Sequence, residues 1–361
     1  MKAAVLREVG RALTVEDVAI GKPGPREVLI RTVATGVCHS DLHFLEGSYP
    51  TPLPTVLGHE SAGVVEAVGS AVSRLKVGDH VVTCLSAFCG HCDHCLTGHL
   101  SRCASPEVQR PDDTEPRLGA AGAPMAQFLN VSAFAEQMLV HENACVAIRP
   151  DMPLDRAALL GCAVVTGFGA VTRTAGVRPG ENVVVIGCGG VGLSAVNAAA
   201  IAGAGRIIAV DRSPAKEALA RSFGATDFVD ASGVDPVKGV RDLVRGGVHH
   251  AIEAVGLAVT AEQAFAMLAR GGVATIVGMI PVGQKISVPG AQFLGERSIR
   301  GSMMGSNVFP IDVPRLVEFY LAGKLHLDKL IARRIPLEQV NEAFAEMKNG
   351  AIARSVVMFD R

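Results

Sequence analysis

The fold of the central part of the chain is decided by residues 183–192, which read VVVIGCGGVG. Four β-branched residues predict a short buried strand, and the apolar run 191–202 predicts the helix that follows it. Between them, Gly187, Gly189 and Gly192 match the pattern G-x-G-x-x-G. The first glycine allows a tight turn, the second lets backbone approach a pyrophosphate, and the third lets helix pack on strand. In a chain with 40 glycines the motif alone is weak, and a pure packing role is the alternative.

The next strand strengthens the dinucleotide interpretation. Residues 207–210 read IIAV and are followed by Asp211. An acidic side chain at this place accepts hydrogen bonds from the adenosine ribose and repels a 2′-phosphate, which favours NAD over NADP. The neighbouring Arg212 weakens that preference, and a solvated strand end is the alternative for Asp211.

Strands and helices alternate from about residue 154 to residue 303. Residues 227–229, 250–255 and 273–277 predict further strands, and Ser213 with Pro214 predicts a helix start. This alternation predicts a doubly wound parallel sheet covered by helices on both faces.

The flanking segments have a different pattern. Residues 1–100 contain short apolar runs broken by Gly and Pro, which predict a β-rich barrel or sandwich with no helix before about residue 150. Residues 104–127 predict a long Pro-rich and acidic loop, a feature that is usually functional, mobile or an interface. Residues 304–361 predict two amphipathic helices, at about 312–322 and 337–349, and a strand at 355–359.

Composition limits the class of protein. A length of 361 residues suggests about two domains, and a hydrophobic fraction of 49% excludes wholesale disorder. A net charge of −1 argues against a nucleic-acid partner bound by global charge. Residues 182–205 carry no charged side chain, as a membrane span would, but the six glycines among them argue against one. Since no targeting segment is visible either, we expect a soluble cytoplasmic protein.

Four cysteines crowd into one short segment: Cys89, Cys92, Cys95 and Cys103. In a reducing compartment such crowding indicates metal binding more than disulfides. Four thiolates fill a tetrahedral zinc shell and leave no open position, so the spacing predicts a structural zinc site. Disulfides or unliganded thiols are the alternative.

A second group of potential ligands is scattered along the chain. Cys38, His59 and Cys162 are each weak evidence, because cysteine is a common core residue. Together they could supply three ligands, with Glu60 beside them, and leave a fourth position for substrate.

The motifs of the chain, taken in their order along the sequence, match those of a known family. They are residues 36–41 (GVCHSD), 58–60 (GHE), the four-cysteine segment, Gly161-Cys162, residues 187–192 and Asp211. Over essentially its whole length, the chain resembles the zinc-dependent alcohol dehydrogenases of the medium-chain dehydrogenase/reductase superfamily. The resemblance implies a GroES-like catalytic domain, residues 1–163 and 304–361, and a Rossmann domain, residues 164–303. It also implies NAD, two Zn²⁺ per subunit and reversible oxidation of an alcohol to an aldehyde or ketone.

The resemblance also implies roles around the catalytic zinc. Cys38, His59 and Cys162 would hold the ion, with Glu60 as an occasional or outer ligand. Asp41 would fix the ring of His59. Ser40 would take the alcohol proton, and His43 would pass it to solvent.

Further roles concern the cofactor and the substrate. The implied cofactor contacts are His39, Thr166, Gly187, Gly189, Gly190, Val191, Gly192, Asp211, Arg212 and Arg354. Among them, Thr166 and Val191 would pack behind the nicotinamide, and His39 and Arg354 would contact the pyrophosphate. The implied substrate pocket is lined by Tyr49, Leu85, Phe128 and Met279.

Departures from the family pattern refine these expectations. Histidine stands at position 39 where many relatives have arginine, and Leu85 stands where an aromatic ring is common. The second departure implies a wider pocket and a medium or bulky apolar alcohol. The loop 104–127 resembles that of dimeric members and implies a homodimer.

Three alternatives remain open at this point. The first is a dehydrogenase of the thiol adduct of formaldehyde, which shares every motif. The second is a zinc-free quinone or enoyl reductase, against which Cys38, Cys162 and the four-cysteine segment argue. The third is a catalytically silent NAD-binding protein, since fold alone does not prove function.

Overall fold

The computed structural model describes residues 1–110, 114–120, 122–350 and 354–359. The chain divides into two compact units: unit 1 comprises Met1–Cys162 and Val308–Arg361, and unit 2 comprises Ala163–Asn307. Positions 111–113 of the predicted loop, and position 121, lie outside the described residues.

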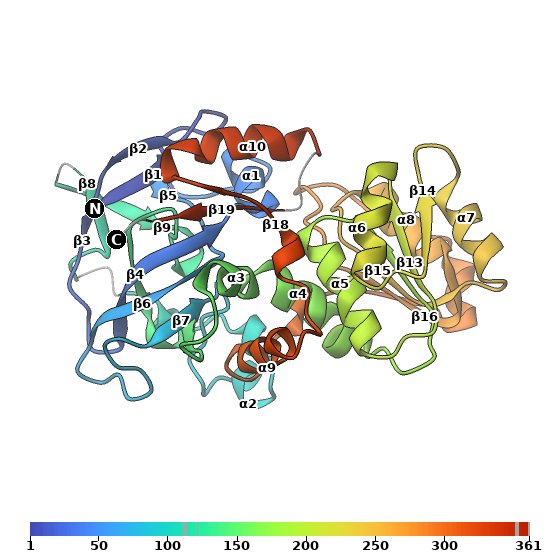
Figure 1. Cartoon of the computed structure of the whole chain (residues 1–361), viewed down its shortest axis with the longest axis horizontal. Helices are drawn as coiled ribbons and strands as arrows, with labels where there is room; N and C mark the ends of the chain where they lie inside the picture. Colours follow the sequence, from blue (N-terminus) through green and yellow to red (C-terminus); the bar gives the residue numbers. More distant parts are fainter. Residues whose placement is uncertain (111–113, 121, 351–353, 360–361) are drawn as a thin grey trace. The chain divides into compact units, whose positions relative to one another are not determined.

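Unit 1 is built on two β-sheets (Figure 1). The first has the strand order β2-β1-β5-β9-β8-β3, and the second has the order β11-β7-β6-β4-β19-β18, with β10 also paired to β4. Their strands are β1 (Lys2–Leu6), β2 (Thr14–Asp17), β3 (Ala19–Ile20), β4 (Glu27–Gly36), β5 (Thr55–Val56), β6 (Ser61–Val68), β7 (His80–Thr83), β8 (Leu118–Ala120), β9 (Ala123–Gln127), β10 (Gln137–His141), β11 (Cys145–Ala147), β18 (Ile331–Ile335) and β19 (Arg354–Met358).

Helices pack around these sheets. They are α1 (His39–Leu45), α2 (Asp93–Leu96), α3 (Leu154–Ala158), α9 (Phe309–Leu321) and α10 (Val340–Lys348). The expectation of no helix before residue 150 was wrong, because α1 and α2 both precede it. At the start of α1, Cys38 and Asp41 form a reciprocal capping box, and Leu42 and Leu45 bury one face of the helix. Seven residues are too short for the helical period to be visible in the sequence.

The predicted loop 104–127 is more ordered than its composition indicates. Its second half contributes β8 and β9 to the first sheet. Both halves are tied to β4, because Arg110 in the first half and Arg117, directly before β8, pair with the buried carboxylate of Glu27. The Nε of Arg117 lies 2.7 Å from Oε1 of Glu27, and both side chains are at most 7% exposed.

Unit 2 is a six-stranded parallel sheet with the order β14-β13-β12-β15-β16-β17. Its strands are β12 (Val183–Ile186), β13 (Ile207–Asp211), β14 (Asp227–Asp230), β15 (Val248–Glu253), β16 (Leu268–Ile276) and β17 (Ser298–Gly301). Its helices are α4 (Ala163–Gly169), α5 (Gly190–Ile201), α6 (Glu217–Ser222), α7 (Pro236–Leu243) and α8 (Ala258–Ala266). Figure 1 shows α5 and α6 along one face of this sheet. The doubly wound parallel sheet is confirmed.

Burial explains the apolar runs of unit 2. All four side chains of β12 are buried, and α5 is buried over most of its circumference. The uncharged stretch 182–206 is therefore a core strand, a turn and a core helix. Among the described residues, no single helix is long and apolar enough to cross a membrane, although the bent pair Leu154–Gly161 and Ala163–Ala175 passes by length and composition.

Candidate functional site

Unit 1 brings Cys38, His59 and Cys162 together, although they are far apart in sequence. Their ligand atoms all lie within 4.8 Å of one another, and Nε2 of His59 is 3.2 Å from Sγ of Cys162. Each comes from a different local structure: the N-cap of α1, the turn between β5 and β6, and the residue after a 3₁₀ turn. At Gly58, with φ +90°, a side chain would clash with the backbone of Phe134, so glycine is needed beside His59.

Asp41 holds this group in place. Its Oδ1 lies 2.9 Å from Nδ1 of His59 and accepts a hydrogen bond from the Gly58 amide at 3.0 Å. Its Oδ2 accepts a bond from the Cys38 amide at 3.2 Å. With Nδ1 of His59 donating to the carboxylate, Nε2 presents its lone pair to the sulfurs.

The donor set fits a zinc ion. For Zn–S and Zn–N bonds of about 2.3 and 2.1 Å, tetrahedral geometry places N and S about 3.6 Å apart. The observed His59–Cys162 distance of 3.2 Å is a few tenths of an ångström shorter. The Cys162 hydrogen bond, with help from the Arg354 charge, holds the pKa of Cys38 well below its ordinary value. The same hydrogen bond and burial raise the pKa of Cys162. A zinc ion would stabilise both sulfurs as thiolates at once, because it places two positive charges directly beside them.

Glu60 and Arg354 lie next to the three ligands. The Nη2 of Arg354 is 3.5 Å from Oε2 of Glu60 and 3.5 Å from Sγ of Cys38, and both charged side chains are at most 3% exposed. The Nη1 of Arg354 donates to the Val37 carbonyl at 2.9 Å. The guanidinium therefore compensates negative charge around the cysteine sulfur.

Polar and aromatic side chains of unit 1 surround the group. Oγ of Ser40 is 3.7 Å from Sγ of Cys38. His43 lies one turn after Ser40 in α1, and its ring centroid is 6.3 Å from that of Tyr49. Phe128 is buried with its ring 6.0 Å from that of His59. Leu85 is half-buried, and its carbonyl accepts a bond from Asn130.

The four-cysteine segment forms a second sulfur cluster in unit 1. Sγ of Cys92 lies 3.5 Å from Sγ of Cys95 and 3.9 Å from Sγ of Cys103, and Sγ of Cys89 is 3.9 Å from that of Cys95. A tetrahedral ZnS₄ centre with bonds of about 2.3 Å has edges of about 3.8 Å. All nine cysteines are free thiols, so the disulfide alternative is wrong.

Hydrogen bonds and burial shift the pKa values of these sulfurs in opposite directions. The His91 and Cys92 amides lower the pKa of Cys89 to about 6, whereas burial raises the pKa of Cys95 to about 12. Amide donors around cysteine sulfurs favour the thiolate form, and thiolate is the form that binds zinc.

In unit 2, the glycine motif forms the turn between β12 and α5. Gly187 has φ +96°, and a Cβ on Gly192 would lie 1.7 Å from the Gly187 carbonyl oxygen. Gly189 is the N-cap of α5, and Gly190 is its first residue. Open backbone at a helix N-terminus favours a bound phosphate.

Asp211 ends β13 beside this turn. Its Oδ2 accepts a hydrogen bond from the Cys188 amide at 2.7 Å, and its Oδ1 accepts one from the Ser213 amide at 3.0 Å. The carboxylate also pairs with Lys216 at 3.1 Å, and Arg212 is exposed. Asp211 is thus joined to the glycine turn, as its place in the motif predicts.

The remaining predicted residues divide between the units. Thr166 lies in α4, where its hydroxyl is 3.5 Å from the Met304 sulfur, and Val191 lies in the first turn of α5. Met279 follows β16 in unit 2 and is half-buried. His39 is the exposed first residue of α1 in unit 1.

Two charged residues at the carboxyl edge of the unit 2 sheet were not predicted from the sequence. One is Lys216, which neutralises Asp211. The other is Glu253, the buried last residue of β15, whose Oε1 accepts bonds from the Val255 and Gly256 amides. The pattern of an acid directly after a buried strand, which singled out Asp211, could also have found Glu253.

Comparisons with known proteins place this geometry in a family. Residues 24–150 match the model of the alcohol dehydrogenase GroES-like domain, and residues 190–322 match that of zinc-binding dehydrogenases. The chain is 38% identical to S-(hydroxymethyl)glutathione dehydrogenase of Haemophilus influenzae, over 99% of this chain and 97% of that protein.

Two solved structures are similar over nearly their full length. An alcohol dehydrogenase zinc-binding domain protein from Burkholderia ambifaria superposes with a TM-score of 0.95 at 39% identity, covering 100% of this chain and 99% of that one. Benzyl alcohol dehydrogenase from Acinetobacter calcoaceticus superposes with a TM-score of 0.93 at 33% identity, covering 99% of each chain. The chain therefore belongs to the zinc-dependent alcohol dehydrogenases of the medium-chain dehydrogenase/reductase superfamily.

Proposed function

We propose that this enzyme catalyses the reversible, NAD-dependent oxidation of a medium or bulky apolar alcohol to an aldehyde or ketone. The observation that carries the proposal is the convergence of two sulfurs and one imidazole nitrogen within 4.8 Å of one another. Three protein donors leave the fourth tetrahedral position for a substrate oxygen, which is the arrangement of a catalytic zinc site.

Each group of residues has a separate task. Zinc held by Cys38, His59 and Cys162 would supply a Lewis acid for the substrate oxygen, and NAD would accept the hydride. Cys89, Cys92, Cys95 and Cys103 would hold a second, structural zinc. Asp41 keeps the ring of His59 in the ligating tautomer.

Ser40 and His43 carry the proton in this proposal. The hydroxyl of Ser40 lies beside Cys38 and therefore beside the substrate position. Ser40 takes the proton of the alcohol, and His43, three residues later on α1, passes it to solvent. The separation of three residues places both side chains on one side of the helix.

The surroundings of His59 support an apolar substrate. Phe128 packs between the rings of His59 and Phe44, whose centroids lie 6.0 and 4.9 Å away, and Tyr49 lies 5.8 Å from Phe44. The benzyl alcohol dehydrogenase of similar structure acts, by its name, on an aromatic alcohol. The thiol adduct of formaldehyde is the second candidate, because the relative from Haemophilus influenzae is named for it.

A substrate panel tests the proposal. NADH absorbance is followed with aliphatic, benzylic and secondary alcohols, with the matching aldehydes, and with formaldehyde in the presence and absence of glutathione. We expect turnover of apolar alcohols that a zinc chelator abolishes. Turnover of formaldehyde only with glutathione would establish the second candidate, and no turnover in any arm would refute both.

The predicted homodimer and cytoplasmic location are part of the proposal. Unoxidised cysteines at the six sulfur ligand positions fit a reducing compartment. Sedimentation equilibrium of the purified protein measures the number of subunits, and a monomer would contradict the predicted homodimer.

A further inference from the structure

The surface of unit 2 has an open pocket of about 470 Å³ that takes no part in the proposed reaction and is called the cavity below. Several of its lining side chains, Arg241 and Arg270 among them, are exposed to solvent. Its lining is strongly basic, because three arginines and no acidic residue contribute to it. The lining residues are Arg241, Arg270, Ala291, Gln292, Leu294, Gly295 and Arg297.

The cavity lies at the amino edge of the parallel sheet. Arg297 directly precedes β17, Arg270 is near the start of β16, and Arg241 lies in the last turn of α7, which leads back to β15. The glycine turn, in contrast, follows the carboxyl end of β12. Dinucleotides bind outside the carboxyl ends of the strands, so the basic cavity is separate from the proposed cofactor site.

Backbone carbonyls orient two of the arginines. Nε and Nη2 of Arg241 donate to the carbonyl of Ala266, the last residue of α8, at 3.2 and 2.7 Å. Nε of Arg297 donates to the Ala269 carbonyl at 3.3 Å, and its Nη1 donates to Gln292. These bonds hold both side chains in place and leave further guanidinium donors unused.

A β-bulge carries the third arginine. The pairing of β15 with β16 shifts between Val248/Leu268 and His250/Val273, so residues 269–272 of β16 leave the regular ladder. Gly271 has φ +74° and allows this bend. Bulges re-aim side chains, and here the bulge carries Arg270, which has no hydrogen bond or ion pair within the described part of the chain.

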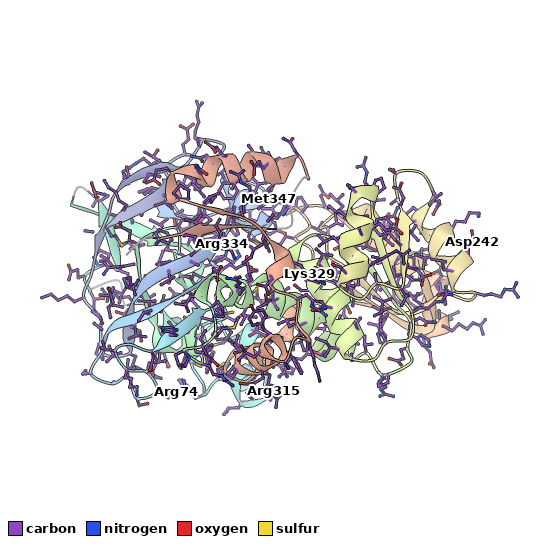
Figure 2. All side chains as sticks on the ribbon, viewed as in Figure 1. Arg74, Asp242, Arg315, Lys329, Arg334 and Met347 are labelled. Atoms are coloured by element: carbon purple, nitrogen blue, oxygen red, sulfur yellow. The ribbon has the colours of Figure 1, made fainter. Side chains whose placement is uncertain are left out.

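Two carboxylates on the helices α7 and α8 have partners of their own. Asp242 projects from the outer side of α7 (Figure 2) and pairs with Lys238 at 2.7 Å. Glu262 accepts a hydrogen bond from the Ser287 amide at 2.8 Å. Burial and the charges of Arg241 and Arg270 lower the pKa of Arg297, so the three cations repel one another. Among the described residues, none of the three forms an ion pair with a carboxylate, and Glu296 is exposed next to Arg297.

We propose that this cavity is a binding site for a compact polyanion of the oligophosphate class. Its volume corresponds to about sixteen water molecules of the liquid, which is enough room for a di- or triphosphate chain. Guanidinium groups pair with phosphate oxygens in bidentate geometry, and three of them match the charge of such a chain. The site is independent of the proposed activity.

Calorimetric titration of the purified full-length protein with inorganic triphosphate tests the proposal. The titration is repeated with saturating NADH and with ATP in place of triphosphate. We expect binding that NADH leaves unchanged. Arg270→Ala is expected to weaken it about tenfold or more, and Arg241→Ala/Arg297→Ala to abolish it, as expected for charge-assisted contacts. Arg245→Ala, an exposed arginine of unit 2 outside the cavity lining, is the matched control.

Each result decides whether the cavity binds an oligophosphate. The proposal is supported if the parent and the Arg245 variant bind equally, Arg270→Ala binds more weakly and the double variant does not bind. The ATP arm distinguishes a nucleotide from free oligophosphate. Absent binding, equal binding by all variants, or competition with NADH would overturn it. If triphosphate does not bind and the cavity variants change the sedimentation of an oligomer, the arginines contact a second subunit and the proposal is wrong. Thermal unfolding of each variant confirms that it is folded.

Discussion

Oδ1 of Asp41 lies 2.9 Å from Nδ1 of His59, and both side chains are fully buried. Burial alone would lower the pKa of His59, but the charge and hydrogen bond of Asp41 raise it above its ordinary value. The carboxylate thus sets both the orientation and the proton position of a proposed zinc ligand.

Replacement of this carboxylate is the first test. Asp41→Asn is expected to weaken binding of zinc at the Cys38 site by 10- to 100-fold, the usual effect of removing such a partner. Competition with a chromophoric chelator measures the affinity. Asp17→Asn, which alters an exposed carboxylate paired with Lys2, serves as control, and equal losses in both variants would contradict the assigned role.

The ligand set itself is tested by Cys162→Ser and His59→Ala. Both are expected to retain NADH binding, because the glycine turn and Asp211 lie in unit 2. Turnover is expected to fall by about a thousandfold or more, since a Lewis acid supplies several kcal/mol to the reaction. Steady-state rates and fluorescence titration with NADH measure the two properties. Turnover close to that of the parent would remove the catalytic-zinc assignment.

Metal content tests the sulfur cluster. The parent is expected to contain two zinc ions per chain by elemental analysis, and Cys103→Ser about one, with faster proteolysis between residues 89 and 103. Structural zinc of this kind contributes on the order of 10 kcal/mol to local folding. Cys145→Ser, which removes a buried thiol outside both clusters, is expected to keep two ions. A content of one ion in the parent would refute the prediction.

Cofactor choice depends on Asp211 in the proposed function. The parent is expected to prefer NAD, and Asp211→Ser to lower the ratio of kcat/KM for NAD over NADP by about tenfold or more. Removal of the carboxylate frees Lys216 and leaves Arg212 exposed beside the site, and both can pair with a 2′-phosphate. Asp230→Ser changes the residue paired with Asp211 at the end of β14 and is expected to leave the ratio unchanged. Equal kinetics of the parent with both cofactors would contradict the assignment.

Acid stability tests the link between Glu27 and the segment 104–127. Despite burial, Arg110 and Arg117 hold the pKa of Glu27 below its ordinary value of 4.5. A group whose pKa is lower in the folded state than in the unfolded state stabilises the protein at pH values above its unfolded-state pKa. This contribution is lost as the pH falls through the folded-state pKa. Glu27→Gln is expected to cost about 3 kcal/mol at neutral pH, because Arg117 stays buried without its partner.

The pH profile of this variant is the decisive readout. The difference in unfolding free energy between the parent and Glu27→Gln should shrink as pH falls below about 4.5, the ordinary value. Denaturant unfolding at several pH values measures it. Glu217→Gln breaks an exposed pair with Arg221 and should cost at most about 0.5 kcal/mol. A difference that is constant with pH would show that charge plays no part.

Sequence patterns predicted unit 2 in more detail than unit 1. Strand, glycine turn and helix follow one another within residues 183–201, so local periodicity was sufficient there. In unit 1 the strands pair over long separations, as β4 does with β19, and periodicity alone does not specify such pairing. The short helices α1 and α2 were missed for lack of a full helical period.

The residue types of the candidate site could be predicted from the sequence, but their arrangement in space could not. The cysteine spacing indicated one metal group directly. Cys38, His59 and Cys162 are separated by up to 124 positions, so only the family resemblance joined them before the structure did. The basic cavity left no sequence signal, because its three arginines come from separate elements and meet only through a bulge and a helix end.

The insertion of unit 2 between the two segments of unit 1 has a consequence for synthesis on the ribosome. Strand β19, which pairs with both β4 and β18, is translated after every residue of unit 2. Domains generally fold as units while the chain emerges, so the contiguous unit 2 can complete its sheet while the earlier-made segment still lacks two strands. Unit 2 can therefore fold before unit 1 is complete, and nascent unit 1 has an open sheet edge along β4 until β19 has left the exit tunnel.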